Sequence, residues 1–295
     1  MANTIAGVNL ARVAQDSLPA LTDLFAPLSA LSTDFSTDIS QSGESITTRI
    51  PTNVTAGDMT SGYQTNASDV AMVSKTVLLD QFKGFTYGFT DLERSKSEID
   101  LNRLFLEPAM EAVGEAVFGY IWDLVVNANF ASTEVITAAN FDRDDLADFN
   151  ALLTTAKTLK SGRSVFANPA YYASLVKTLN NAEIPGITSD KAGAIVPRVA
   201  NFDTYETTLA DANGESLAAF AFHKSALIMA ARTVVADEMT AKAGVDVETV
   251  VIPGLGLPVQ FRKWYSADGT LYFNVNVLFG ASVGVGTAGH RITSA

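Results

Sequence analysis

The longest helical pattern in the chain covers residues 93–128, and it limits the folds that the sequence can adopt. Apolar side chains recur there at steps of three and four residues, with acidic side chains between them. Ser97 or Asp100 can cap its start, and Pro108 removes one hydrogen bond inside it and is expected to bend it. A helix of about 25–28 residues spans roughly 40 Å. That length exceeds what a compact domain of this size needs, so the pattern predicts an elongated framework element.

An extended hairpin is predicted before this helix, over residues 43–92. Apolar and polar residues alternate around Ile46 and Ile50, and a second extended run covers 73–79 and continues through 85–89. The polar stretch 53–68 lies between the two runs and predicts a long tip. Since an isolated hairpin buries too little surface to be stable, it lies either on a neighbouring molecule or on the rest of its own chain.

The first 42 residues have a different character. Leucines and valines at helical spacing predict short amphipathic helices, which Pro19 and Pro27 interrupt. This segment is predicted to be an arm that lies on another surface; a frayed terminus is the alternative.

The second half of the chain alternates short helices and strands. A helix is predicted from 146 to 159 with caps at 140–145, followed by a buried strand at 163–168 and a helix at 171–179. A strand at 218–223 and a short helix at 224–231 follow. The last region, 256–295, predicts a hairpin that turns at Asp268-Gly269 and a terminal strand of small residues.

Composition excludes several function classes. The 295 residues include 20 basic and 32 acidic side chains, which gives a net charge of −12, and cysteine is absent. Disulfides, thiolate metal sites and cysteine nucleophiles are therefore excluded, and the acidic balance argues against tight binding to DNA or to an anionic membrane. We find no targeting signal and no apolar run long enough to span a membrane, so a soluble chain made in the cytoplasm is expected.

Patterns that could support chemistry are few. Gly284, Gly286 and Gly289 match a dinucleotide fingerprint, but the chain ends too soon for the helix and the acid that this fingerprint needs. Asp142, Asp144 and Asp145 lack the glycine and glutamate of a calcium loop, so helix capping is the preferred interpretation. His223 is interpreted as a packed or rim residue, while Lys75 and Lys83 are interpreted as solvated strand lysines. No catalytic, cofactor-binding or metal-binding residue is predicted.

The order of these elements is the most informative feature. An arm, a long two-stranded loop, one long helix, a mixed region and a returning hairpin resemble the tailed-bacteriophage major capsid protein family, which has the Hong Kong 97-type fold. The resemblance covers nearly all of the chain. It rests on short segments in a fixed order: Phe82–Phe89 with Asp91-Leu-Glu93, Leu106-Glu-Pro108, Ala221–Ala226, Phe261–Tyr265, Leu271-Tyr-Phe273, Leu278-Phe-Gly280 and Val283-Gly-Val285.

The resemblance implies an α+β phage major capsid fold with five parts. These are an N-terminal arm at 1–42, an extended E-loop at 43–92, a peripheral domain with the spine helix at 93–159, an axial domain at 160–255, and a return to the peripheral sheet at 256–295. It further implies a structural protein rather than an enzyme, one that needs no cofactor.

The resemblance also implies a function and a set of partners. The chain would assemble with itself, as hexamers and pentamers, into an icosahedral shell around the double-stranded DNA of a tailed phage. Portal and separate scaffolding or decoration proteins would be partners, DNA would be enclosed without sequence-specific binding, and no membrane would be involved. The protein would be made and assembled in the host cytoplasm and end in the virion. Two alternatives stay open: an encapsulin-like compartment shell, and a soluble α/β enzyme.

Overall fold

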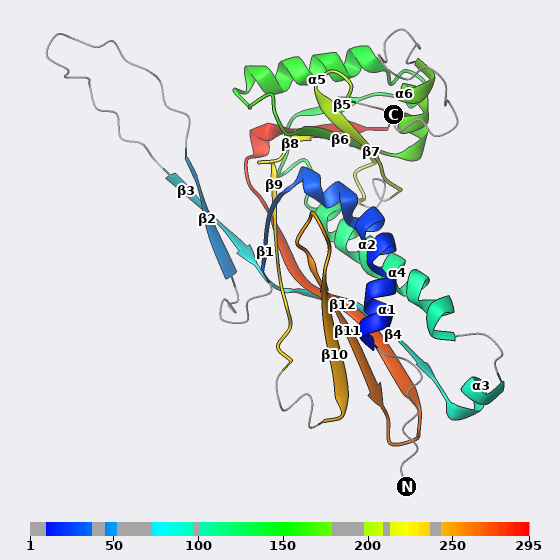
Figure 1. Cartoon of the computed structure of the whole chain (residues 1–295). Helices are drawn as coiled ribbons and strands as arrows, with labels where there is room; N and C mark the ends of the chain where they lie inside the picture. The colour runs from blue at the N-terminus through cyan, green and yellow to red at the C-terminus, as the bar shows by residue number, and fades with distance from the viewer. Residues whose placement is uncertain are drawn as a thin grey trace, which may run out of the picture.

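The computed structural model describes residues 10–36, 45–51, 72–96, 101–178, 198–208, 213–236 and 243–294. Two β-sheets lie one above the other, and a narrow hairpin projects to one side (Figure 1). The helices are α1 (Leu10–Asp16), α2 (Leu18–Phe25), the 3-10 turn η1 (Ala26–Ala30), α3 (Asp91–Lys96), α4 (Leu101–Asp123), α5 (Arg143–Thr155), α6 (Pro169–Thr178) and the 3-10 turn η5 (Gly286–Ala288). The strands are β1 (Ser32–Ser36), β2 (Ser45–Pro51), β3 (Met72–Leu78), β4 (Gln81–Phe89), β5 (Thr133–Val135), β6 (Arg163–Ala167), β7 (Phe202–Glu206), β8 (Leu217–His223), β9 (Leu227–Arg232), β10 (Val245–Val251), β11 (Pro258–Tyr265), β12 (Leu271–Val283) and β13 (Gly289–Thr293).

The lower, six-stranded sheet is organised around β12. This strand pairs antiparallel with β4, β9 and β11, while β10 pairs with β11 and β1 pairs in parallel with β9. Alternate β12 residues such as Phe273 and Val275 are buried, because one face of the sheet carries the core. The predicted turn between β11 and β12 is confirmed, and Gly269 adopts the positive φ of 86° that such a turn needs.

The helix α4 covers the core face of the six-stranded sheet, together with α1 and α2 (Figure 1). It confirms a long helix within the predicted range 93–128, but it covers 23 residues only, because Asp91–Lys96 is assigned to α3 and no helix continues after Asp123. Pro108 lies inside α4, and the proposed caps Ser97 and Asp100 lie outside the described residues. The helices α1 and α2 confirm the amphipathic pattern of the N-terminal segment. They pack on β10, β11 and α4 of their own chain, so this part of the segment already has a surface within the subunit.

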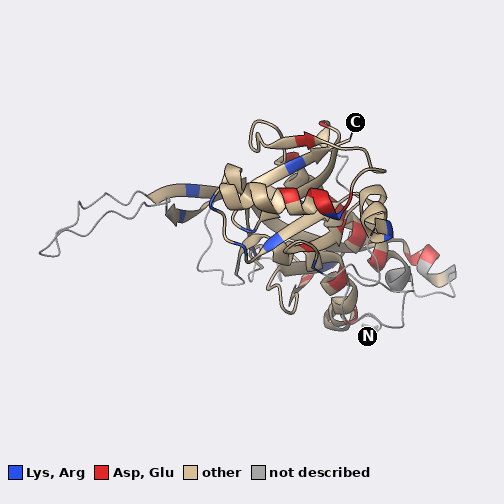
Figure 2. Cartoon of the chain, turned by 90° about the horizontal axis from the view of Figure 1, so that it is seen from above, with Lys and Arg blue, Asp and Glu red and all other residues tan. Residues whose placement is uncertain are grey.

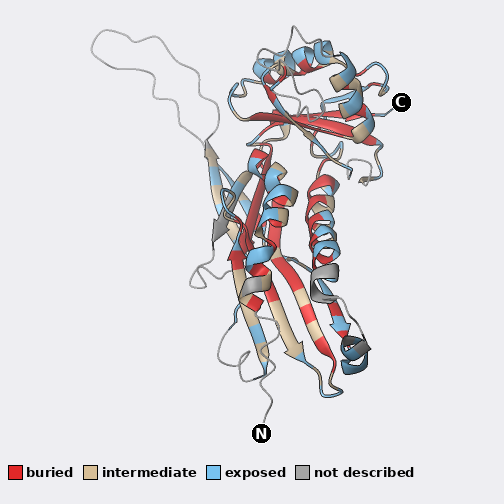
Figure 3. Cartoon of the chain, turned by 45° about the vertical axis from the view of Figure 1, so that its right-hand side comes forward, coloured by how far each residue is buried: buried red, intermediate tan, exposed pale blue. Residues whose placement is uncertain are grey.

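The upper, five-stranded sheet has the order β5-β13-β8-β6-β7. Every residue of β6, β8 and β13 is buried, and α5 and α6 pack against the sheet. Figure 3 shows these strands as a continuous buried layer beneath largely exposed helices. A second apolar core, which includes Phe141, Phe149 and Tyr171, fills the space between them.

Three sequence-based expectations need correction. The predicted helix at 224–231 is wrong, because Leu227–Arg232 forms the buried strand β9 between β1 and β12, where pairing and burial outweigh local helix propensity. Residues 81–89 belong to the six-stranded sheet rather than to the hairpin. The predicted return of 256–295 to one sheet holds for β11 and β12 only, since β13 pairs with β5 and β8 in the five-stranded sheet.

The two sheets also divide the chain differently from the predicted boundaries at 160 and 255. The helix α5 packs on the five-stranded sheet, whereas β9 and β10 lie in the six-stranded sheet. The cause is that the chain crosses to the five-stranded sheet after α4, returns to the six-stranded sheet after β8 and crosses again after β12. Turn residues do not show which sheet the next strand joins.

The projecting hairpin consists of β2 and β3, paired antiparallel from Ser45 opposite Leu78 to Pro51 opposite Met72. The base of the hairpin lies over β9, where Val77 packs against Ile228 and Ala230. Gly280 of β12 permits this close crossing, since a Cβ at that position would lie 1.7 Å from the Leu78 carbonyl oxygen.

We therefore expect Gly280→Ala to lower the free energy of unfolding by about 1–3 kcal/mol, because the hairpin backbone must move away. Gly119→Ala in α4 is the matched control: a Cβ there meets nothing within 4 Å, and alanine favours a helix by about 0.5–1 kcal/mol. Chemical denaturation measures both. Equal stability of the Gly280→Ala variant and the parent would contradict the close crossing.

Candidate functional site

Within the described ranges, no three His, Asp or Glu side chains gather closely enough to hold a metal ion. No helix in the part that the structure describes is both long and apolar enough to cross a membrane.

The glycine motif does not precede a helix. Gly286–Ala288 forms a short 3-10 turn and Gly289 begins β13, so the predicted strand starts later than expected. A Cβ on Gly289 would lie within 2.8 Å of Phe130 and Phe220, and one on Gly284 would lie 2.2 Å from the Ser225 carbonyl oxygen. These glycines therefore allow close packing of the chain.

The acidic triplet caps α5, as predicted. The Asp142 carboxylate accepts hydrogen bonds from the backbone N–H groups of Asp144 (2.8 Å) and Asp145 (3.3 Å), and Asp145 accepts the Asp142 N–H at 2.9 Å. This reciprocal pair is a capping box, which satisfies backbone groups at the start of the helix. Burial is the main cause that raises the pKa of Asp145.

Both histidines are buried. The Nδ1 atom of His223 lies 2.8 Å from the Ser225 hydroxyl, and the Nδ1 atom of His290 lies 2.7 Å from the Ser132 hydroxyl. The Nε2 atom of His290 lies 3.7 Å from the Glu134 carboxylate, beyond hydrogen-bond distance. Burial lowers the pKa of His290 to about 4, and burial followed by the charges of Lys224 and Arg163 lowers the pKa of His223.

Of the two strand lysines, Lys75 lies on β3 and Lys83 on β4.

The His290 pKa predicts a loss of stability in mild acid. Because the folded-state pKa of about 4 is below the ordinary value of 6.5, the unfolded chain binds more protons between these pH values. The stabilisation is complete above pH 6.5 and is lost as the pH falls to about 4, by up to about 3 kcal/mol. We expect His290→Gln to flatten this dependence when unfolding is measured from pH 7 to pH 4. A variant that keeps the full slope would contradict the assignment.

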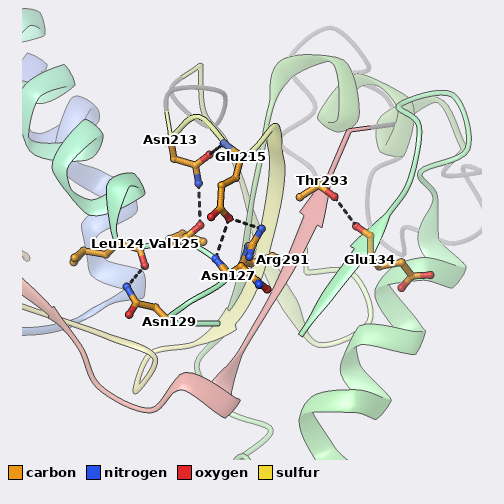
Figure 4. A network of polar contacts seen from close by, with 9 residues as sticks. All are labelled: Leu124, Val125, Asn127, Asn129, Glu134, Asn213, Glu215, Arg291 and Thr293. Atoms are coloured by element: carbon orange, nitrogen blue, oxygen red, sulfur yellow. Dashed lines mark hydrogen bonds and ion pairs between the residues drawn. The ribbon is translucent and has the colours of Figure 1, made fainter. Parts of the chain in front are cut away.

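A polar network joins the end of α4 to the five-stranded sheet (Figure 4). Glu215 accepts a charged hydrogen bond from Nη2 of Arg291 at 2.7 Å and another from the backbone N–H of Asn127 at 2.9 Å. The Asn213 amide donates to the Val125 carbonyl at 2.8 Å and accepts the Glu215 N–H at 3.1 Å. The network fixes the segment that follows α4, through Val125 and Asn127, against β13, and it thereby couples α4 to the five-stranded sheet. No sequence pattern predicts this network, because its members are spread over nearly 170 residues.

The clearest candidate for a functional surface is apolar and exposed. On β3, Met72 and Leu78 are 61% and 52% exposed, on the face opposite to the buried Val77. On β4, which pairs only with β12 among the described strands, Phe82 and Phe85 are 56% and 44% exposed. Phe82 and Phe85 lie on opposite faces of β4, whereas Met72 and Leu78 share one face of β3. Apolar side chains exposed on an edge strand and on a projecting hairpin are typical of surfaces that a partner covers. We call Met72 and Leu78 the outer face of the hairpin.

Charge is distributed unevenly over the molecule. In Figure 2 the described part of the hairpin carries basic side chains, from Arg49 and Lys75, while acidic side chains gather on the helices. Arg49 and Lys75 therefore make the described part of the hairpin basic within an acidic chain.

No family model matches the chain, and no curated protein matches it. Solved structures do match it over nearly its whole length. The capsid structure of the cyanophage P-SCSP1u is 11% identical with a TM-score of 0.59, over 90% of this chain and 86% of that chain. A structure from Mycobacterium phage Che8 is 18% identical with a TM-score of 0.57, over 92% and 90%. The mature capsid of bacteriophage PhiM1 is 9% identical with a TM-score of 0.56, over 90% and 86%. The chain therefore has the α+β fold of phage capsid chains.

Proposed function

We propose that this chain is the major capsid protein of a tailed phage and a structural shell protein rather than an enzyme. The observation that supports this most strongly is the likeness in fold to phage capsid chains over at least 90% of its length. In this proposal the chain has the Hong Kong 97-type fold, and copies assemble as hexamers and pentamers into an icosahedral shell that encloses double-stranded DNA.

The proposal assigns roles to the parts of the subunit. The six-stranded sheet with α4 as spine helix is the peripheral domain, and the five-stranded sheet with α5 and α6 is the axial domain. The hairpin of β2 and β3 is the E-loop, which overlaps a neighbouring subunit, and the N-terminal segment is the arm. These domain assignments are based on which sheet each element belongs to. They replace the domain boundaries predicted from the sequence wherever sheet membership differs from those boundaries.

The exposed hairpin supports self-association on physical grounds. A two-stranded sheet is marginal in water, and the outer face of this one leaves two large apolar side chains exposed. A neighbouring copy that covers this face would stabilise it and remove apolar area from water at about 25 cal/mol per Å². In the proposed shell the neighbour covers the hairpin with a different surface of its own, so the contact is head-to-tail, and such contacts close into rings when the rotation fits.

The charge of the chain fits a container for DNA. A net charge of −12 keeps the inner wall from holding phosphates tightly, so the genome can move while it is packed. In this proposal DNA is enclosed without sequence-specific contacts, portal and separate scaffolding or decoration proteins are partners, and assembly takes place in the host cytoplasm before the protein becomes part of the virion.

The test is to express the chain alone and to examine it by negative-stain electron microscopy with light scattering on the same sample. We expect closed shells, or rings of five or six subunits. A protein that stays a 31.3 kDa monomer, at high concentration, with crowding agents and with a co-expressed scaffolding protein, would contradict the proposal.

A further inference from the structure

A pocket of about 420 Å³ lies on the face of the six-stranded sheet that points away from α1, α2 and α4. Phe261 and Val275 belong to the core that these helices cover, and successive strand residues point to opposite faces of a sheet. The pocket is therefore built on the other face, across four strands. Its lining includes Phe82 of β4, Val245 of β10, Arg262 and Trp264 of β11, and Asn274 and Asn276 of β12.

Arg262 brings a positive charge into this pocket without a counter-charge. No carboxylate lines the pocket, and no ion pair joins Arg262 to a described residue. Its Nε–H donates to the Gln260 side-chain oxygen at 2.8 Å, which is its one hydrogen bond within the described part of the chain. The N–H donors on both Nη atoms have no protein acceptor there. A partly buried cation is normally paired, so the pocket lacks an anion.

An occupant of the pocket can reach these donors. Arg262 and Trp264 are both partly exposed, and of their nitrogen atoms only Nη2 of Arg262 is enclosed and unpaired. The Trp264 ring stacks on Tyr272 with 5.5 Å between the ring centres, which holds its indole group in the wall of the pocket. Asn276 donates to Asn274, and these two amides therefore leave the guanidinium group free for an external acceptor.

We propose that this pocket binds a glutamate or aspartate side chain of a second copy of the chain. A guanidinium group is planar and forms paired, charged hydrogen bonds with a carboxylate. The chain has 32 acidic side chains and 20 basic ones, and acids such as Glu107 and Glu111 on α4 are exposed. Charge complementarity therefore favours another copy, whereas the net charge of −12 repels nucleic-acid phosphates. The inference rests on the proposed function, since it assigns one contact of the assembly.

The test compares two arginine variants that change the net charge equally. Arg262→Gln removes the charge from the pocket, and Arg198→Gln removes one from a half-exposed ion pair elsewhere. Light scattering over a concentration series measures assembly. We expect Arg262→Gln to raise the concentration needed for assembly at least about tenfold, because every contact loses a charged hydrogen bond. Arg198→Gln should stay within about twofold of the parent chain, and Arg262→Lys should fall between the two.

A second arm uses the parent chain, so it does not depend on the folding of a variant. The probe is N-acetyl-glutamate-N-methylamide, and its uncharged glutamine analogue is the control ligand at the same ionic strength. We expect the glutamate probe to inhibit assembly at concentrations of about 10 mM, because it competes for the pocket, and the glutamine analogue to leave assembly unchanged.

Two results overturn the inference while shells still form, and so leave the proposed function intact. One is assembly of Arg262→Gln at the same concentration as Arg198→Gln, and the other is equal inhibition by the glutamate probe and its glutamine analogue. Equal inhibition by inorganic phosphate would also overturn it and would assign the pocket to free anions. A chain that never assembles would overturn the proposed function and this inference together.

Discussion

Replacing Arg163 by methionine is expected to lower the free energy of unfolding by about 3–4 kcal/mol, a large share of the stability of a typical domain. Arg163 begins β6 and is completely buried. Its guanidinium donates to the carbonyl oxygens of Leu159 (2.9 Å), Thr158 (2.8 Å) and Asn150 (2.8 Å). It also donates to the side-chain oxygens of Asn150 and Thr154, so one cation ties the end of α5 to the sheet.

The size of the expected stability loss follows from the hydrogen-bond acceptors that methionine leaves without a donor. It fills a similar volume but cannot donate, so several buried acceptors near the C-terminal end of α5 lose their partner, at about 1–3 kcal/mol each where water cannot replace it. The positive charge near the negative end of the helix is lost as well. Because burial already lowers the pKa of Arg163, the site holds a costly charge only through these hydrogen bonds.

Chemical denaturation followed by circular dichroism measures the change. Arg198→Met is the matched control, since Arg198 is about half exposed and forms a 3.8 Å ion pair with Asp203, worth no more than about 1 kcal/mol. Arg163→Lys should fall between the two, because it keeps the charge without the planar fork. A stability loss below about 1 kcal/mol for Arg163→Met would contradict the role assigned to this residue.

Much of the fold could be predicted from the sequence where local pattern and burial agree. The long helix, the capped helix α5, the buried strands β6 and β8 and the last hairpin all carry a clear period or turn signal, and the structure confirms them. Leu227–Arg232 shows the limit: its alanines and methionine favour a helix, yet it lies between two other strands and is fully buried. The sheet that β13 joins could not be predicted either, because strand partners depend on contacts with residues far away in the sequence.

Only part of the candidate site could be predicted from the sequence. The alternation of apolar and polar residues predicted the hairpin. Only the structure, with the register of β2 against β3, shows that Met72 and Leu78 share the outer face while Val77 points to the sheet. The Glu215–Arg291 contact could not be predicted, since it joins elements that are distant in the chain. A single charged residue belongs to no periodic pattern, so the sequence does not indicate which charged residues will come into contact.

Placing two aspartates on the outer face of the hairpin, as Met72→Asp/Leu78→Asp, is expected to abolish assembly while leaving the subunit folded. Both side chains are more than half exposed in the single subunit, so their replacement should change its stability by no more than about 0.5 kcal/mol. In the proposed shell a neighbouring copy covers this face, and burying two unpaired carboxylates there costs several kcal/mol at every contact. Light scattering and negative-stain microscopy should show subunits in place of shells or rings.

The conservative double variant Met72→Leu/Leu78→Met is the control, because it keeps the apolar area and nearly the same volume; it should assemble like the parent chain. Thermal unfolding of the separated subunits establishes that the aspartate variant is folded. Normal assembly of the aspartate variant would show that this face is not an interface, even if the chain forms shells. Loss of assembly in both variants would point to shape rather than burial as the requirement. Loss in the aspartate variant alone is the result expected if a second copy covers the hairpin, since a covered position needs the apolar area that the control variant keeps and does not accept an unpaired carboxylate.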